Sequence, residues 1–85
     1  MPLICSFNGI NIYMYYIYGE HEPPHIHALY QGKSAIINIV DYKIKGQTNV
    51  PKSIISKIIK WMEKHQEELL QIWRTQVFNK ISPDY

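Results

Sequence analysis

The sequence predicts an α+β domain, in which a four-stranded, mostly antiparallel meander sheet is followed by one long C-terminal helix packed on one face. Short apolar segments between turn residues fill the first half of the chain, and apolar residues recur at helical spacing in the last third. The 85 residues form a single domain (1–85), with a sheet portion (1–50), a helical portion (51–78) and a tail (79–85) whose end is expected to be frayed.

The first two strands are predicted over residues 3–7 and 10–16. Asn8-Gly9 between them is a strong hairpin signal, because both residue types tolerate a positive φ. Along the second strand, alternation places Ile10, Ile12, Met14 and Tyr16 on the expected core face and Asn11, Tyr13 and Tyr15 on the other.

The third strand is predicted over residues 25–30, after a loop over residues 17–24, and the fourth over residues 33–40. Gln31-Gly32 forms the turn between them. Residues 41–49 are polar and basic, and Tyr42 and Ile44 within them are expected either to form a short fifth strand or to cover a sheet edge.

A helix is predicted to begin at Val50-Pro51, since proline is favoured in a first helical turn, and Thr48 or Asn49 is expected to cap it. Apart from Trp61, the apolar residues between 54 and 77 fall within an arc of about 160° at helical spacing, which one continuous helix explains. The polar gap over residues 64–68 is where a bend or a break into two helices would occur.

Three large residues of the predicted helix have individual expected roles. Trp61 lies just outside the apolar arc and Trp73 inside it, and both are expected to anchor the core. His65 lies at the edge of the arc, where a half-buried structural role is expected.

Composition is that of an ordinary globular domain, with 46% apolar and 19% charged residues. No apolar run approaches the ~20 residues of a membrane span, so no membrane association is expected. The N-terminus lacks the basic start of a signal peptide, and a cytoplasmic location is expected. Cys5 is the single cysteine and is expected to be a buried strand residue. A net charge of +2 does not by itself indicate nucleic-acid binding.

Residues 20–27, with the sequence Glu-His-Glu-Pro-Pro-His-Ile-His, contain three of the four histidines. The two prolines favour extended backbone, so a strand is expected to start directly at His25. His25 and His27 would then project from the same face, ~6–7 Å apart at Cα. His21 lies on the other side of the Pro-Pro segment.

The histidines allow a metal site as one interpretation. A His-x-His pair on a strand can present two imidazoles to one ion, and His21, Glu20 or Glu22 would supply a third ligand. However, a cupin pattern requires a glutamate a few residues later, and a histidine-triad pattern requires histidine where Leu29 stands. We therefore expect no metal and no other cofactor, with His21, His25 and His27 as the fallback ligand set.

Two metal-free interpretations stay open. In the first, His25 and His27 are the general base and general acid of a ribonuclease. Lys33 or Arg74 would hold the phosphate, and Tyr13, Tyr15 or Tyr18 would stack on bases. In the second, the histidines bond to loop carbonyl groups and lock the Pro-Pro turn, and the same surface, His21 included, binds a protein partner.

Several motifs occur in a recognisable order. They are the Asn-Gly-Ile hairpin, a tyrosine-rich strand, His21-x-Pro-Pro-His25-x-His27, Val50-Pro51-Lys52, and a helix with Trp61, Glu67-Glu68-Leu69-Leu70 and Trp73. Over roughly residues 2–75 the sequence resembles the small bacterial family called domain of unknown function 4160. The resemblance implies a gene beside that of a second small protein, an arrangement like a toxin–antitoxin pair. It implies no catalytic residues.

Together these features predict the toxin-type component of a bacterial toxin–antitoxin-like pair, with RNA-directed, metal-independent activity at His25 and His27. The expected partners are a small antitoxin-like or target protein, and RNA. The alternative is a non-enzymatic protein-binding module, such as an inhibitor or adaptor related to phage or defence, with the His/Pro/Tyr loop as its interface.

Overall fold

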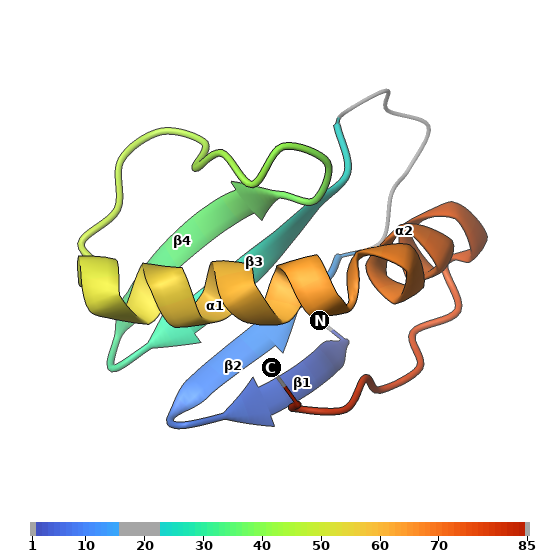
Figure 1. The fold of residues 1–85 in the computed structure, drawn as a ribbon, viewed down its shortest axis with the longest axis horizontal. Coiled ribbons are helices and arrows are strands. Elements are labelled where there is room, and N and C mark those ends of the chain that lie inside the picture. The colour runs from blue at the N-terminus through green and yellow to red at the C-terminus, as the bar shows by residue number, and fades with distance from the viewer. Residues whose placement is uncertain (1, 16–22, 85) are drawn as a thin grey trace.

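The computed structural model describes residues 2–15 and 23–84 (Figure 1). Within them the elements are β1 (Leu3–Phe7), β2 (Ile10–Tyr13), β3 (His25–Tyr30), β4 (Lys33–Asn38), α1 (Lys52–Lys64) and α2 (Gln66–Thr75). The strands form one sheet in the order β1-β2-β3-β4, and each pairs antiparallel with its neighbour. The predicted α+β class and meander are confirmed. The prediction of one long helix is wrong, because the helical portion is divided into two.

Both tight hairpins have two central residues with positive φ, the geometry whose twist matches that of the flanking strands. Asn8 and Gly9 have φ values of 50° and 76°, and Gln31 and Gly32 have values of 48° and 76°. The Asn-Gly turn was predicted for this reason. These turns set the register of the meander, and a slip by one residue would turn each strand's core face to solvent.

The fourth strand ends at Asn38, two residues earlier than predicted, because the chain reverses there. The Tyr42 N–H donates to the Asn38 carbonyl at 3.0 Å, and Tyr42 has a φ of 60°. The returning segment then lies along the edge of β4, where the Lys45 N–H donates to the Ile36 carbonyl at 2.8 Å. Ile44 forms an isolated bridge with Ile37. This segment therefore covers an edge instead of forming a fifth strand.

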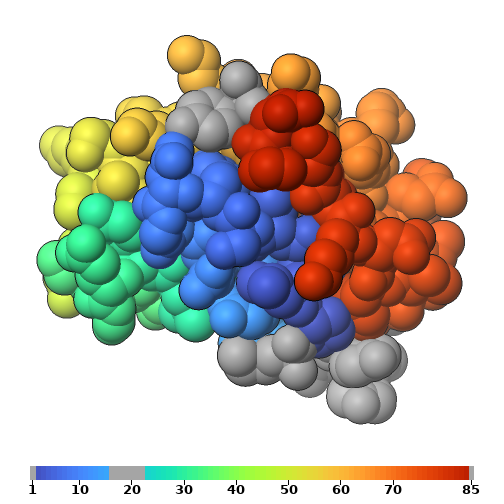
Figure 2. All heavy atoms as spheres, turned by 90° about the horizontal axis from the view of Figure 1, so that it is seen from below, coloured from blue at the N-terminus to red at the C-terminus, as the bar shows by residue number. Residues whose placement is uncertain are grey.

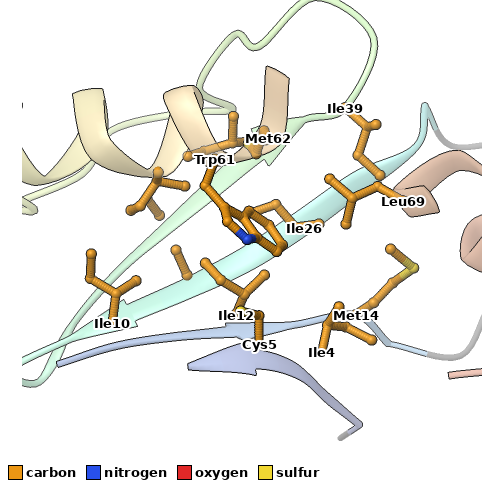
Figure 3. Close-up of a cluster of buried hydrophobic side chains, with 14 of the residues drawn as sticks. Ile4, Cys5, Ile10, Ile12, Met14, Ile26, Ile39, Trp61, Met62 and Leu69 are labelled. Atoms are coloured by element: carbon orange, nitrogen blue, oxygen red, sulfur yellow. The ribbon is translucent and has the colours of Figure 1, made fainter. Parts of the chain in front are cut away.

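The hydrophobic core lies between the sheet and α1, which crosses one face of it (Figures 1 and 3). Trp61 is fully buried and extends from α1 toward Ile12 and Ile26, as Figure 3 shows. Leu69 brings α2 into the same cluster. The predicted core role of Trp61 is confirmed, whereas Trp73 is only half-buried.

The helical portion breaks at His65, within the predicted polar gap. Its φ of −116° and ψ of 20° lie outside the helical range, and its N–H is shared between the Trp61 and Met62 carbonyls at 3.1 and 3.2 Å. The His65 ring is 7% exposed. It is therefore more deeply buried than the half-buried position that the sequence predicts.

The N-terminus of α1 differs from the prediction. Pro51 is the N-cap residue, and no side chain caps the helix. The Thr48 hydroxyl instead donates to the Ser34 carbonyl at 2.7 Å and accepts from the Val50 N–H at 3.1 Å. Thr48 thus fastens the preceding loop to β4, a non-local contact that sequence spacing does not reveal.

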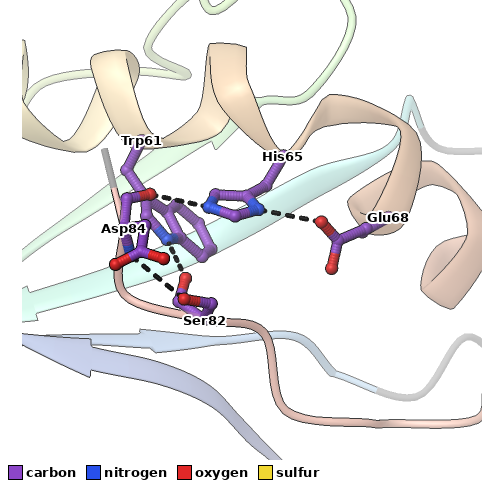
Figure 4. A network of polar contacts seen from close by, with 5 residues as sticks. All are labelled: Trp61, His65, Glu68, Ser82 and Asp84. Atoms are coloured by element: carbon purple, nitrogen blue, oxygen red, sulfur yellow. Dashed lines mark hydrogen bonds and ion pairs between the residues drawn. The ribbon is translucent and has the colours of Figure 1, made fainter.

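The C-terminal segment, whose end was expected to be frayed, is bound to the domain as far as Asp84. Ile81 is buried, and its N–H donates to the Ile4 carbonyl at 2.9 Å, so the segment lies against β1 (Figure 2). The Trp61 indole N–H donates to the Ser82 carbonyl at 2.8 Å (Figure 4).

His65 holds the same segment at a second point. Its Nε2 lies 2.7 Å from the Asp84 carbonyl oxygen and its Nδ1 lies 2.9 Å from a Glu68 carboxylate oxygen (Figure 4). Both partners are acceptors, so the two bonds form together only when both ring nitrogens carry a proton. His65 is therefore a structural junction between α1, α2 and the C-terminal segment.

Candidate functional site

The candidate site lies on the face of the sheet opposite to α1, which we call the open face. Its residues alternate with those of the covered face along β2, β3 and β4, whereas a register shift between Leu3 and Cys5 interrupts the alternation in β1. All of the open-face residues are half-buried or exposed: Leu3, Ser6, Asn11, Tyr13, His25, His27, Leu29, Ser34, Ile36 and Asn38. None of these ten residues is acidic. One row crosses all four strands, because Leu3 pairs with Tyr13, Tyr13 with His27, and His27 with Ile36.

His25 and His27 lie side by side on this face, as the sequence predicts. Their ring centroids are 5.2 Å apart and their planes meet at 60°. Both residues are half-buried. This arrangement follows from the strand period, since residues two apart on β3 point to the same face.

The orientation of His25 is set by the Pro-Pro segment. Its Nδ1 lies 2.9 Å from the carbonyl oxygen of Pro23. A carbonyl oxygen only accepts, so Nδ1 is the donor, and Nε2 holds the lone pair when the ring is neutral. The Ile39 N–H also donates to the Pro24 carbonyl at 2.8 Å, which ties the segment to the end of β4. When neutral, His25 is therefore held in the tautomer that carries its proton on Nδ1.

Two further rings extend the histidine pair into what we call the ring cluster, formed by Tyr15, His27, His25 and Trp73. The Tyr15 ring lies edge-on to His27 with centroids 4.2 Å apart. The Trp73 ring lies 5.0 Å from His25 at 58°. Three parts of the chain meet here: the segment that follows β2, β3 and α2.

Trp73 is the residue that the sequence did not assign to this site. Its position in the apolar arc predicted a core role, and the break at His65 changes the direction of α2, so that the indole reaches His25. No local pattern signals this contact, because it depends on how α2 is placed against the sheet.

The other predicted binding residues are not all brought together. Tyr13 lies opposite His27 on the neighbouring strand. Lys33 pairs with Tyr30, at a position on the face that α1 covers, and lies three residues from Ile36, or ~10 Å along the strand. Arg74 is exposed and follows Trp73 on α2. Tyr18 and His21 lie outside the described residues.

Over residues 2–15 and 23–84, no three His, Cys, Asp or Glu side chains come together in a group that could hold a metal ion. The fallback set of His21, His25 and His27 also includes a residue outside these ranges.

Cys5 belongs to the core and not to the site. It is 4% exposed and is on the face that α1 covers. Burial raises the pKa of its thiol, with a smaller opposing contribution from a backbone hydrogen bond at Ser6. At neutral pH the residue is thus an apolar thiol, the form without nucleophilic reactivity.

Comparison with known proteins identifies the family. A family model described as "Domain of unknown function (DUF4160)" matches residues 9–74, a range that includes the whole ring cluster. Neither the curated proteins nor the solved structures contain a match. Among the described helices, none is both long and apolar enough to cross a membrane. The match covers most of the chain, which therefore belongs to the DUF4160 family.

Proposed function

We propose that this protein binds single-stranded RNA on the open face of its sheet and cleaves it with His25 and His27. In this proposal it is the cytoplasmic, toxin-type component of a bacterial toxin–antitoxin-like pair. The observation that carries the proposal is the histidine pair itself, two half-exposed imidazoles 5.2 Å apart, of which His25 has a preset tautomer.

The His25 tautomer suits the role of general base. Because Nδ1 donates to the Pro23 carbonyl, the Nε2 lone pair of the neutral ring is available to take a proton. Imidazole is effective in this role because its ordinary pKa is near neutral pH. The backbone carbonyl also fixes the ring plane, which reduces the reorganisation needed when substrate binds.

The proposed reaction has one chemical step. The 2′-hydroxyl oxygen attacks the adjacent phosphorus while Nε2 of His25 takes its proton. The bond from phosphorus to the 5′-oxygen breaks, and protonated His27 donates its proton to that leaving oxygen. The products are a 2′,3′-cyclic phosphate and a free 5′-hydroxyl. At a ring separation of 5.2 Å, the two imidazoles can contact different oxygen atoms of one phosphodiester.

Aromatic side chains support RNA as the substrate. Tyr13, Tyr15 and Trp73 surround the histidines, and bases of single strands stack on such rings at ~1–3 kcal/mol each. The open-face residues carry no carboxylate that would repel a phosphate backbone.

A second candidate is a non-enzymatic protein-binding module, an inhibitor or adaptor that uses the His/Pro/Tyr surface. The row Leu3, Tyr13, His27 and Ile36 favours it, since half-buried apolar and aromatic residues in a continuous row are typical of interfaces. In either case the family resemblance suggests a small protein partner, antitoxin-like in the first case and a target in the second.

Cleavage of a fluorescent single-stranded RNA by purified protein, followed by electrophoresis, tests the proposal. We expect wild type to cleave in the presence of chelator with a bell-shaped pH profile, and His25→Ala and His27→Ala each to lose ~100-fold or more while staying folded. Ser56→Ala is the control, because it removes an exposed side chain from α1, which lies on the other face of the sheet.

Absence of cleavage by wild type over a range of RNA sequences would contradict the catalytic proposal. If His25→Ala and His27→Ala then abolished capture of the protein encoded by the adjacent gene, the binding-module candidate would replace it.

A further inference from the structure

A cavity of about 310 Å³ lies at the opposite end of β4 from the ring cluster. The start of β4 and the loop before α1 form its walls, and the lining residues are Gly32, Lys33, Ser34, Gln47, Thr48 and Asn49. Apart from the glycine they are all polar, and Lys33 is the single charged residue among them. Such a lining favours a small anionic group over an apolar ligand or a cation.

Hydrogen bonds hold the walls of this cavity together. The Thr48 hydroxyl donates to the Ser34 carbonyl at 2.7 Å and accepts from the Val50 N–H at 3.1 Å. The loop reaches this position through Gly46, whose φ of 75° is readily adopted by glycine. The cavity is therefore formed before any ligand binds, which lowers the cost of binding.

The part of the sequence that includes the lining residues is basic. Between residues 33 and 52 there are four lysines and one aspartate, a net charge of +3. Lys33, Lys43, Lys45 and Lys52 are all exposed. The carboxylate of Asp41 accepts a hydrogen bond from the Lys43 backbone N–H at 3.0 Å. A net positive charge in this part of the chain raises the local concentration of phosphate groups.

The position of the cavity relates it to the ring cluster. Ser34 belongs to both the cavity and the open face, and it lies two residues along β4 from Ile36, the partner of His27. Two residues correspond to ~7 Å along a strand. A stacked strand rises by ~3.4 Å per nucleotide along its axis, so this distance corresponds to about two nucleotides.

We infer that this cavity is a phosphate-binding subsite for the RNA strand, with Lys33 pairing with a backbone phosphate a few nucleotides from the cleaved bond. The amide groups of Gln47 and Asn49 and the Ser34 hydroxyl supply further hydrogen-bond donors. The inference rests on the proposed function for the identity of the ligand. It assigns Lys33 to a second site, separate from the histidines beside which the sequence analysis placed it.

Binding of a labelled ten-residue 2′-O-methyl oligouridylate tests the subsite, because this probe lacks the 2′-hydroxyl needed for cleavage. Anisotropy titrations at several salt concentrations give the dissociation constant and its salt dependence. We expect Lys33→Ala to weaken binding by ~5- to 10-fold and to reduce the salt slope by ~0.7, the value for one phosphate contact on a single strand. Lys33→Arg, which keeps the charge, should stay within about two-fold of wild type.

Lys60→Ala is the matched control, since Lys60 is an exposed lysine of α1 and its removal changes the net charge equally. We expect it to bind as wild type does. If Lys33→Ala and Lys60→Ala weaken binding of the probe equally, the protein attracts RNA only through its overall charge, and the subsite is overturned. Failure of the wild type to bind the probe would also overturn it.

The subsite and the cleavage proposal can fail separately. Lys33-dependent binding without any cleavage of the unmodified RNA would retain the subsite and remove the catalytic role. If cleavage depends on the histidines but Lys33→Ala binds the probe as tightly as wild type, the catalytic role would be retained and the subsite removed.

Discussion

The indole of Trp73 lies against the imidazole of His25, with ring centroids 5.0 Å apart, although one residue belongs to α2 and the other begins β3. The Pro23 carbonyl contacts the same imidazole through Nδ1. His25 is thus held by a hydrogen bond and by a ring contact. Both contacts bear on its proposed role, and each can be tested.

The first prediction concerns Trp73 as a positioning residue. Trp73→Ala should reduce RNA cleavage by ~10-fold or more, because His25 loses the ring that holds its orientation. Trp73→Phe keeps an aromatic face and should recover most of the rate. Gln71→Ala, at an exposed position of α2, is the control. A purely structural role would lower the melting temperature and leave the rate of the folded fraction unchanged.

The second prediction concerns the tautomer of His25. At alkaline pH, where the imidazole is neutral, long-range ¹H–¹⁵N spectra should show the proton on Nδ1 and the lone pair on Nε2. The Pro23 carbonyl enforces this state because it only accepts. Spectra of His25→Gln identify the signals by their loss. A proton on Nε2 would contradict the proposed general base.

The third prediction concerns the C-terminal segment. Removing residues 81–85 should lower the free energy of unfolding by ~3 kcal/mol or more, since it exposes the site of Ile81 and removes bonds from Ser82 and Asp84. Urea denaturation measures the loss. Removing residues 84 and 85 alone is the control, because it keeps Ile81 and Ser82, and its cost should be ~1–2 kcal/mol. No loss in either variant would mean that the segment is frayed in solution.

The fourth prediction concerns stability at alkaline pH. Burial raises the pKa of the Cys5 thiol above its ordinary value of ~8.5, so the folded state holds this proton more tightly than the unfolded state. The resulting stabilisation is fully present below pH ~8.5 and is lost as the pH rises above this value. The free energy of unfolding should therefore change little below pH ~8.5 and fall between pH ~8.5 and 9.5.

Cys5→Ala provides the comparison for this measurement. The variant should be less stable at every pH because of the cavity, but its stability should fall less steeply over the same range. The range stops below pH 10 because burial, and to a smaller extent the charge of Glu63, also raise the pKa of the Tyr42 hydroxyl. Identical slopes for both proteins would contradict the assignment.

The features predicted correctly are local ones. Asn8-Gly9 specified the first hairpin because both residues accept a positive φ, and Pro23-Pro24 specified an extended entry into β3 at His25. The alternation along β3 then placed His25 and His27 on one face. Each of these features follows from the steric preferences of a few neighbouring residues, and these preferences do not depend on the rest of the fold.

The features missed depend on residues distant in the chain. Thr48 fastens a loop to Ser34 instead of capping α1, and the C-terminal segment is held by Trp61 and His65. The polar gap indicated where the helix would break, but contacts from Asp84 and Glu68 meet at His65 only in the folded domain.

The sequence by itself thus determined the meander, the core face of the second strand and the histidine pair, because alternation and turn chemistry are local properties of the backbone. The tertiary structure alone decided that Trp73 joins the histidines and that Lys33 lines a separate cavity. The direction of α2 and the path of the loop before α1 follow from packing between segments far apart in sequence, and no local preference encodes them.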